Sequence, residues 1–252
     1  MAPKTVLVVS PHPDDELIPA GGSLLILREA GWRVHNLACG LGRPDQHERR
    51  RRELTRACET AGFQLDCVEP PVTMSSGDDL DAARHRLGAS IGQRLQALEP
   101  QLLLAPGPAD VHHAHELVAR AVVGAVETTA RPQPVWWWEL WGHLRHATLL
   151  VDVEHVLDRV IAALCSHAAE LERSDYARLV AARAQVASIL GPERVLGYGT
   201  GAALGRAAEV LCETAFTARG WRFGRPRLLD NRSPRIGPFD GGDASRFIAG
   251  SG

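Results

Sequence analysis

The sequence predicts an α/β protein with a Rossmann-like three-layer fold and a mostly parallel sheet. Two observations indicate this class: short apolar runs alternate with helical patterns along the chain, and glycines end several of the helical patterns. Repeated β-α-β units build a mostly parallel sheet with helices on its faces. At 252 residues, 45% of them hydrophobic, the chain is long enough for one sizeable domain with a full core.

The strand-like runs are short and rich in Val, Leu and Trp. The first of them, TVLVVS at 5–10, leads directly into a loop of polar residues. We expect strands, in chain order, at 5–10, 33–39, 65–68, 101–105, 135–140 and 148–153.

The helical patterns between these runs carry apolar residues at helical spacing. In 46–61, for example, Leu54, Ala57 and Ala61 share one face, and Gly62 ends the pattern. We expect helices at 23–30, 46–61, 80–98, 113–129, 154–169 and 175–190.

These elements place residues 1–220 in a single domain. Residues 221–252 are rich in Gly, Pro, Arg and Asp and contain only isolated apolar residues. This composition is typical of an extended arm, and the sequence does not decide whether the arm wraps the surface or is partly mobile.

The bulk composition argues against several classes of partner. A net charge of −2 gives no electrostatic reason to expect nucleic acid or membrane binding, and no apolar run approaches the ~20 residues that span a bilayer. The five cysteines are scattered without a CxxC pair, as is typical of reduced thiols. The amino-terminal residues lead into the first strand without a signal-peptide pattern, so we expect a cytoplasmic protein.

The pentapeptide His12-Pro13-Asp14-Asp15-Glu16 directly follows the first predicted strand. In an open α/β sheet, ligands bind beyond the carboxyl ends of the strands. We expect one of the two adjacent aspartates to bind a divalent metal ion and the other to remain unligated and act as a base. The same residues are also compatible with a solvated loop in which Asp14 or Asp15 caps the next helix.

A second polar cluster follows the strand at 101–105. His112, His113 and His115 lie within four positions there, at what should be another strand's carboxyl end. One of these histidines, together with His12 and Asp15, would form a site of two histidines and one carboxylate. Three protein ligands leave a coordination position for water, which is typical of catalytic rather than structural zinc.

Both clusters together resemble the LmbE-like family of zinc-dependent N-deacetylases, which includes the de-N-acetylase of glycosylphosphatidylinositol synthesis. The resemblance covers about residues 4–200 and is strongest at 10–16, followed by Ala20-Gly21-Gly22. The family's second motif, usually His-Pro-Asp-His, falls on 112–115, where Ala114 replaces the usual Asp. Asp110 is a candidate to substitute for that missing carboxylate.

The resemblance implies a role for each residue of the two clusters. It implies that His12, Asp15 and His115 bind Zn²⁺, that Asp14 is the general base, and that His112 stabilises the transition state. The implied reaction removes an N-acetyl or other short N-acyl group from a small molecule that contains glucosamine.

Two further features concern the substrate. The family carries an Arg-x-x-Glu whose arginine contacts a sugar hydroxyl, which singles out Arg50 here. The tryptophan-rich run 135–141 offers rings for stacking, with Trp138 as the candidate, although some of its indoles must be core. This run and the segment 174–199 also resemble, more weakly, a subgroup that deacetylates precursors of glycopeptide antibiotics.

Three other functions are compatible with parts of the pattern. A two-histidine, one-carboxylate set also holds iron in non-haem oxygenases, and a metal phosphoesterase uses similar residue types. A carbohydrate-binding α/β protein without catalysis is the non-enzymatic alternative. The sequence leaves open the native metal, the aglycone and the oligomeric state.

Overall fold

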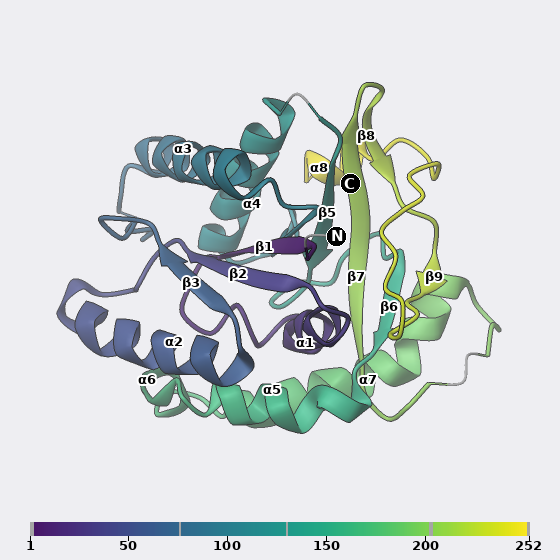
Figure 1. The fold of residues 1–252 in the computed structure, drawn as a ribbon, viewed down its shortest axis with the longest axis horizontal. Helices are drawn as coiled ribbons and strands as arrows, with labels where there is room; N and C mark the ends of the chain where they lie inside the picture. Colours follow the sequence, from purple (N-terminus) through teal and green to yellow (C-terminus); the bar gives the residue numbers. More distant parts are fainter. Residues whose placement is uncertain (1–2, 76, 130, 202–203, 251–252) are drawn as a thin grey trace.

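The computed structural model describes residues 3–75, 77–129, 131–201 and 204–250, and it confirms the expected α/β class. Helices cover both faces of one central sheet (Figure 1). Among the described residues the strand order is β3-β2-β1-β4-β5-β7-β6-β9, and β8 pairs with β7 outside this path. The fold is therefore three-layered, as the sequence predicts.

The first five strands form the parallel part of the sheet, and β1 lies at its centre between β2 and β4. The chain moves from β1 outward to β2 and β3, then returns to the other side of β1 for β4 and β5. Such a reversal leaves a crevice at the carboxyl ends of the two strands where it occurs, β1 and β4. The bounds of these strands are β1 Thr5–Ser10, β2 Arg33–Ala38, β3 Gln64–Cys67, β4 Leu102–Pro106 and β5 Gln133–Trp138.

The rest of the sheet is mixed in direction because β7 runs antiparallel to its partners β5, β6 and β8. The sequence analysis missed β7, which is the longest of the described strands. Its ten residues include the buried Glu213 and the half-buried Glu209, so the apolar pattern is interrupted. The bounds are β6 Leu149–Asp152, β7 Ala208–Thr217, β8 Gly220–Phe223 and β9 Arg227–Leu228.

The helices form the two outer layers (Figure 1). One layer contains α3 Leu80–Leu98, α4 His113–Glu127 and the short α8 Ser245–Ile248. The other contains α1 Gly21–Glu29, α2 His47–Ala61, α5 Leu157–Leu164, α6 Ala168–Leu171 and α7 Tyr176–Leu196. Single turns of 3₁₀ helix, Pro44–Gln46 and Glu154–Val156, precede α2 and α5.

Alternate residues of each central strand enter the two separate halves of the core. Val6 and Val8 of β1 pack on the α1, α2 and α5 side, whereas Leu7 and Val9 pack on the α3 and α4 side. Successive side chains of a strand point to opposite faces, so a strand covered on both faces is apolar throughout. This requirement explains the continuous apolar sequence of β1.

The helix expected at 154–169 is instead divided into α5 and α6. The break falls at Cys165, Ser166 and His167, and the His167 side chain turns inward to contact the buried Glu16, with Nε2 2.6 Å from Oε1. A charge-bearing contact in the core replaces one turn of helix, which the apolar periodicity alone does not reveal. The next helix, α7, continues beyond the expected residue 190 to Leu196.

The segment after residue 220, expected to be an extended arm, contributes β8 and β9 to the sheet. A buried carboxylate on β7 attaches the segment: Glu213 accepts hydrogen bonds from Arg227 Nη1 and Nη2 and from the main-chain N of Gly237, at 2.5, 2.9 and 3.0 Å. Glu213 also accepts one from Trp136 Nε1 at 2.9 Å. These contacts support describing the segment as part of the same domain. No helix in the described part of the chain is both long and apolar enough to cross a membrane.

Candidate metal centre

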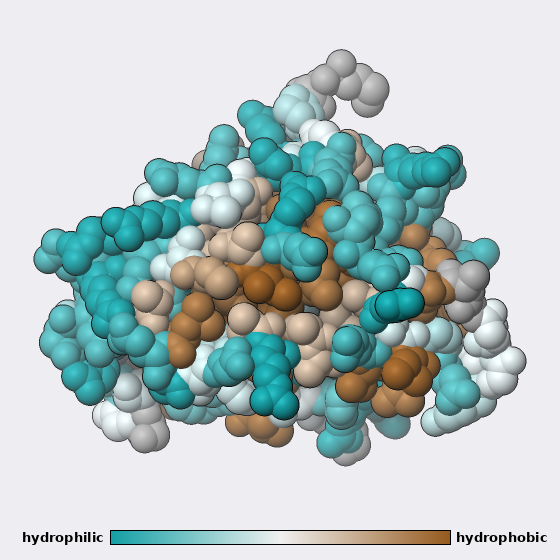
Figure 2. All heavy atoms as spheres, turned by 90° about the horizontal axis from the view of Figure 1, so that it is seen from below, coloured by the Kyte–Doolittle hydropathy of each residue, from teal (hydrophilic) through white to brown (hydrophobic). Residues whose placement is uncertain are grey.

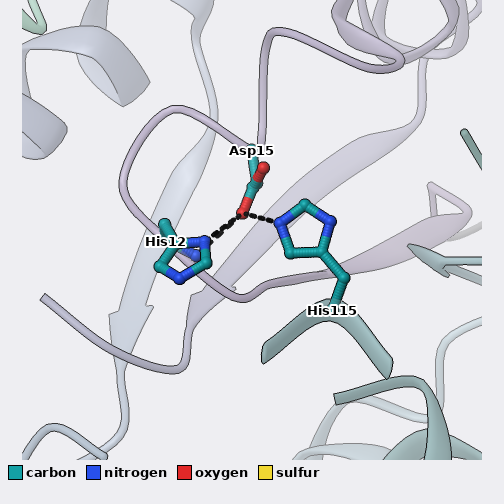
Figure 3. A group of neighbouring side chains, drawn as sticks. All are labelled: His12, Asp15 and His115. Carbon is teal, nitrogen blue, oxygen red and sulfur yellow. Dashed lines mark hydrogen bonds and ion pairs between the residues drawn. The ribbon is translucent and has the colours of Figure 1, made fainter. Parts of the chain in front are cut away.

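The two histidine-containing clusters meet at the crevice between β1 and β4. His12 and Asp15 lie in the loop after β1, and His115 lies in the first turn of α4, which follows β4. Figure 3 shows the three side chains pointing toward one another around one oxygen of Asp15. The fold thus brings together residues that are about a hundred positions apart in the sequence.

The geometry of these three side chains fits a divalent metal ion. Asp15 Oδ2 lies 3.2 Å from His12 Nδ1 and 3.4 Å from His115 Nε2, and one donor atom from each residue lies within 4.8 Å of the others. His115 is buried, yet within the described residues neither of its ring nitrogens has a hydrogen-bond partner. A buried imidazole nitrogen that faces a carboxylate but makes no hydrogen bond is available to bind a metal ion.

The charges of the site point the same way. Burial disfavours the charged forms of both Asp15 and His115, but their mutual attraction outweighs it. The pKa of His115 rises to about 9, mainly because of Asp15 and then Asp110, and the pKa of Asp15 falls below its usual range, mainly because of His115 and then His12. The site therefore favours a positive charge beside the Asp15 carboxylate. The protonated His115 supplies that charge here, and a bound cation would supply it equally well.

Asp110 supports His115 from behind the site. Its Oδ2 lies 3.5 Å from His115 Nδ1, while its Oδ1 accepts a hydrogen bond from the main-chain N of His112 at 3.0 Å. A carboxylate on Nδ1 orients Nε2 toward a metal and makes it a stronger ligand. The Asp110 carboxylate thus contacts the ring of His115, whereas its contact with His112 is through the main chain.

The tautomer of His112 follows from its place at the start of α4. Its Nδ1 accepts a hydrogen bond from the main-chain N of Ala114 at 3.3 Å, so Nε2 carries the proton. Burial, and then the neighbouring His12, His115 and His113, lower its pKa to about 4. His112 is therefore a neutral hydrogen-bond donor near pH 7. The remaining histidine of the cluster, His113, turns away and places Nε2 2.5 Å from the main-chain O of Met74.

Asp14 is held in an uncommon backbone conformation next to the His12, Asp15 and His115 set. Its φ is 111°, in the left-handed region, and its main-chain N donates to Glu16 Oε2 at 3.0 Å. Glu16 is in turn fixed by the contact with His167. Burial, then the nearby Asp15 and Glu170, raise the pKa of Asp14 well above its ordinary value. Residues that several contacts hold in a strained backbone conformation are often found at functional sites.

A cavity of about 80 Å³ opens beside these groups. Arg50 of α2, the arginine singled out in the sequence, lies on its wall, and its Nη2 pairs with Glu170 Oε1 at 2.6 Å. The residues that line the cavity are His12, Asp14, Asp15, Ile18, Arg50, His112, His115, Leu140, Trp141, Glu170, Arg173 and Tyr176.

The sequence analysis missed the wall formed by Glu170, Arg173 and Tyr176. Arg173 Nη2 lies 2.7 Å from Glu170 Oε2 and donates to the Tyr176 hydroxyl at 2.8 Å. Together with Arg50, these groups form a network of charges opposite the histidines. The signal in the sequence is the polar run 170–174 between the two expected helices at 154–169 and 175–190.

The position of Trp138 does not fit the predicted stacking role. Its side chain is fully buried, and its ring contacts the ring of His115 edge to face at a centroid distance of 5.1 Å. Trp138 therefore packs against His115 and is not among the described residues that line the metal cavity. Trp141 is the tryptophan that lines the cavity: it is 47% exposed, and its ring lies 6.2 Å from that of His112.

Comparison with known proteins agrees with this site. Residues 7–126 match the family described as GlcNAc-PI de-N-acetylase (PIG-L). A Bacillus cereus protein described as a probable N-acetyl-alpha-D-glucosaminyl L-malate deacetylase 2 is 30% identical over 189 residues, covering 66% of this chain and 84% of the relative.

The solved structures that resemble this chain share its fold at low sequence identity. The deacetylase Dbv21, which acts on the pseudoaglycone of the antimicrobial reagent A40926, matches with a TM-score of 0.63 and 17% identity over 88% of this chain and 98% of its own. The 4-carboxy-2-hydroxymuconate hydratase GalB from Pseudomonas putida matches with a TM-score of 0.62 and 17% identity over 91% and 100%. The fold therefore carries more than one activity, and the site must decide between them.

A His–Asp–His site at the switch point of an α/β sheet, with a free carboxylate beside it, defines a metal-dependent enzyme. The chain belongs to the PIG-L, or LmbE-like, family, as the resemblance of its motifs implies, and it is a metal-dependent N-deacetylase.

Proposed function

We propose that this protein is a zinc-dependent hydrolase that removes an N-acetyl or short N-acyl group from a small molecule containing glucosamine. The observation that carries the proposal is the set His12, Asp15 and His115, with the unligated Asp14 at the same cavity. Two imidazoles and one carboxylate suit zinc, and three protein ligands leave a position for water. When bound, the ion would polarise the amide carbonyl and make water nucleophilic at neutral pH.

Asp14 is the proposed general base. Its carboxyl group lies on the cavity wall and stands outside the set of metal ligands, so it is free to accept a proton from the attacking water. It then returns this proton to the departing amine of the sugar. The fixed main chain at Asp14 holds the carboxyl group in place throughout.

His112 is proposed to stabilise the negative charge that develops on the carbonyl oxygen. Its Nδ1 is occupied by α4, so the Nε2–H is available as a donor toward the cavity. A positioned donor of this kind contributes about 3–4 kcal/mol to the stabilisation of the transition state. Arg50, paired with Glu170, is proposed to bind a sugar hydroxyl.

The metal assignment is tested by elemental analysis. His12→Ala and His115→Ala should each lose most of the bound zinc, because each removes one of three ligands. His113→Ala is the matched control, since His113 contacts the main chain of Met74 instead. Wild-type zinc content in both ligand variants would overturn the assignment.

The role of Asp14 is tested by Asp14→Asn. This variant should keep its zinc and its fold but release acetate from N-acetylglucosaminides at least ~100-fold more slowly, as expected for loss of a positioned base. Acetate release at the wild-type rate would make Asp14 a structural residue only.

The substrate class we favour is a secondary metabolite such as a glycopeptide antibiotic precursor. The exposed ring of Trp141 at the mouth of the cavity suits a bulky or aromatic aglycone. The family match supports this amide hydrolysis over an oxygenase, a phosphoesterase or a non-catalytic sugar-binding protein.

We also propose a cytoplasmic location, since all five cysteines lie in the described part of the chain and are free thiols.

A further inference from the structure

A second, larger depression lies directly beside the metal cavity. This groove has a volume of about 450 Å³, and Ile18 lines both it and the metal cavity. Glu139 lines the groove, and the next residue, Leu140, lines the metal cavity. The two depressions therefore adjoin each other at Ile18 and at the Glu139–Leu140 pair.

One helix runs along both depressions. Tyr176, in the first turn of α7, lines the metal cavity, and Val180, Ala184 and Ala187 of the same helix line the groove. Residues at these spacings share one face of a helix. A molecule that extends from the metal cavity along α7 would enter the groove.

The charged side chains of the groove are already engaged with other groups of the protein. Arg194 forms two hydrogen bonds with Glu139, at 2.8 and 2.7 Å, and Arg183 donates to the main-chain O of Glu139 and of Leu140, at 2.5 and 2.9 Å. Glu209 accepts hydrogen bonds from the main-chain N of Gly22 and of Ser23, both at 2.8 Å. What the groove offers to a ligand is therefore mainly apolar surface.

Apolar side chains are exposed at the rim of this groove. Val186 and Leu190 line it and are 52% and 48% exposed. Apolar patches are visible on the face of the molecule that carries α5 and α7 (Figure 2). Exposed apolar surface beside an active site is typical of a ligand-binding groove.

We propose that this groove binds an apolar aglycone on the amino-sugar substrate. The proposal rests on the proposed function, because it assumes that the amide of an N-acyl amino sugar occupies the metal cavity. Small-molecule sites usually measure about 300–1,000 Å³, so a cavity of about 80 Å³ holds only the reacting end of a substrate. The adjoining groove has the volume and the apolar character to hold an attached alkyl or aromatic group.

The experiment compares two substrates with the same sugar. Acetate release is measured with the methyl and the hexyl glycosides of N-acetylglucosamine, the latter well below any concentration at which it aggregates. The hexyl glycoside should have a KM about tenfold lower, because burying several methylenes favours its binding. The kcat values should be similar, since this contact acts on the ground and transition states alike.

Substitutions on α7 connect this preference to the groove. Leu190→Asp should raise the KM for the hexyl glycoside about tenfold, which removes the preference, and leave the methyl glycoside unchanged. Ile189→Asp is the matched control: it is 73% exposed on the same helix but is not one of the described residues that line the groove. Both positions are at the surface, so both variants should fold. Ala187→Phe, which fills the groove, should have the same effect as Leu190→Asp.

Two results would overturn the proposal: equal KM values for the two glycosides in the wild type, or a hexyl preference that survives both Leu190→Asp and Ala187→Phe. Calorimetric titration of the two glycosides separates this proposal from the proposed function. Hexyl-selective binding that Leu190→Asp abolishes, without acetate release from either glycoside, would uphold the groove and reject the deacetylation. An absence of binding and of acetate release would reject both.

A second copy of the chain is the competing occupant of the exposed apolar surface on α7. Sedimentation of the wild type, Ile189→Asp and Leu190→Asp decides between them. Wild-type dimers that both substitutions dissociate would identify an interface between copies and would overturn the aglycone site. An unchanged oligomeric state in all three proteins supports it.

Discussion

Trp138 and Trp141 are three residues apart, yet one packs against His115, a proposed metal ligand, from the core and the other borders the cavity. Trp138→Ala should lower the free energy of unfolding by ~3–5 kcal/mol, because it empties a large buried volume. Trp141→Ala should leave stability within ~1 kcal/mol of the wild type and raise KM about 3- to 10-fold, because it removes a stacking surface. Urea unfolding and steady-state kinetics of both variants check this; a stable Trp138→Ala with a raised KM would reverse the assignment.

Individual residues differ in how far their positions could be predicted from the sequence. The strand ends predict that His12, Asp15 and one histidine of the 112–115 cluster lie close together, and the resemblance to the LmbE-like family singles out His115. The structure places these three side chains together. Trp138 is buried because both faces of β5 are covered: Trp136 and Trp138 enter one half of the core and Trp137 enters the other. Alternation along a strand assigns each residue to one face of the sheet, but it does not reveal whether one face or both faces are buried.

At the scale of an element, the break between α5 and α6 places His167 on Glu16, and Glu16 in turn holds the main chain at Asp14. Burial disfavours the charged imidazole, but the Glu16 carboxylate outweighs burial and raises the pKa of His167 above the ordinary 6.5. The folded state therefore binds this proton more tightly than the unfolded state. The resulting stabilisation is complete below the ordinary pKa and is lost as the pH rises through the raised one.

His167→Gln tests this contact. The loss of unfolding free energy relative to the wild type should be larger at about pH 6 than at about pH 9, since the wild type keeps the charged pair only at the lower pH. Urea unfolding at both pH values measures it. His155→Gln, which breaks an exposed pair with Glu29, is the control and should cost less than ~1 kcal/mol at either pH. A pH-independent loss for His167→Gln would mean that only packing is involved.

The broken helix also shows why this wall of the site escaped prediction. The periodicity of 154–169 is that of one amphipathic helix, and nothing local distinguishes His167 from a surface histidine. Its partner, Glu16, is 151 residues away in the sequence. Glu170 and Arg173 come soon after the break in the chain, so their position on the cavity wall depends on the contact between His167 and Glu16. Helical periodicity carries no information about such a long-range contact.

At the scale of the whole molecule, Glu213 links the central sheet to the last part of the chain. Its side chain is fully buried on β7, between Trp136 and Arg227. Arg227→Ala should lower the free energy of unfolding by about 3 kcal/mol, because it leaves a buried carboxylate without its counter-charge. In the double variant Glu213→Gln, Arg227→Ala the loss should be smaller than the sum of the two single losses, as measured by urea unfolding. Strict additivity would show that the two side chains act independently.

The parallel half of the sheet could be predicted from the sequence, whereas the antiparallel half was only partly predictable. Strands β1, β4 and β5 are largely apolar runs, and all five strands, including the partly polar β2 and β3, are separated by recognisable helices. Strand β7 carries Glu209 and Glu213, whose charges are compensated by the start of α1 and by Arg227. Those compensating groups lie far away in the sequence, so the local pattern of the run does not identify it as a buried strand.

The attachment of Glu213 also constrains the order in which the protein can fold while it is being synthesised. Strand β7 leaves the ribosome before Arg227 and Gly237, the latter 24 residues further along, which complete the hydrogen bonds of its buried carboxylate. Until then, inserting β7 beside β5 would bury a carboxylate with no counter-charge. The nascent chain can therefore assemble β1 to β5, and with them the His–Asp–His set, ahead of the antiparallel half. A pause in synthesis before Arg227 and Gly237 have left the ribosome would expose the unpaired edge of β5 to aggregation, whereas a pause after their release would not.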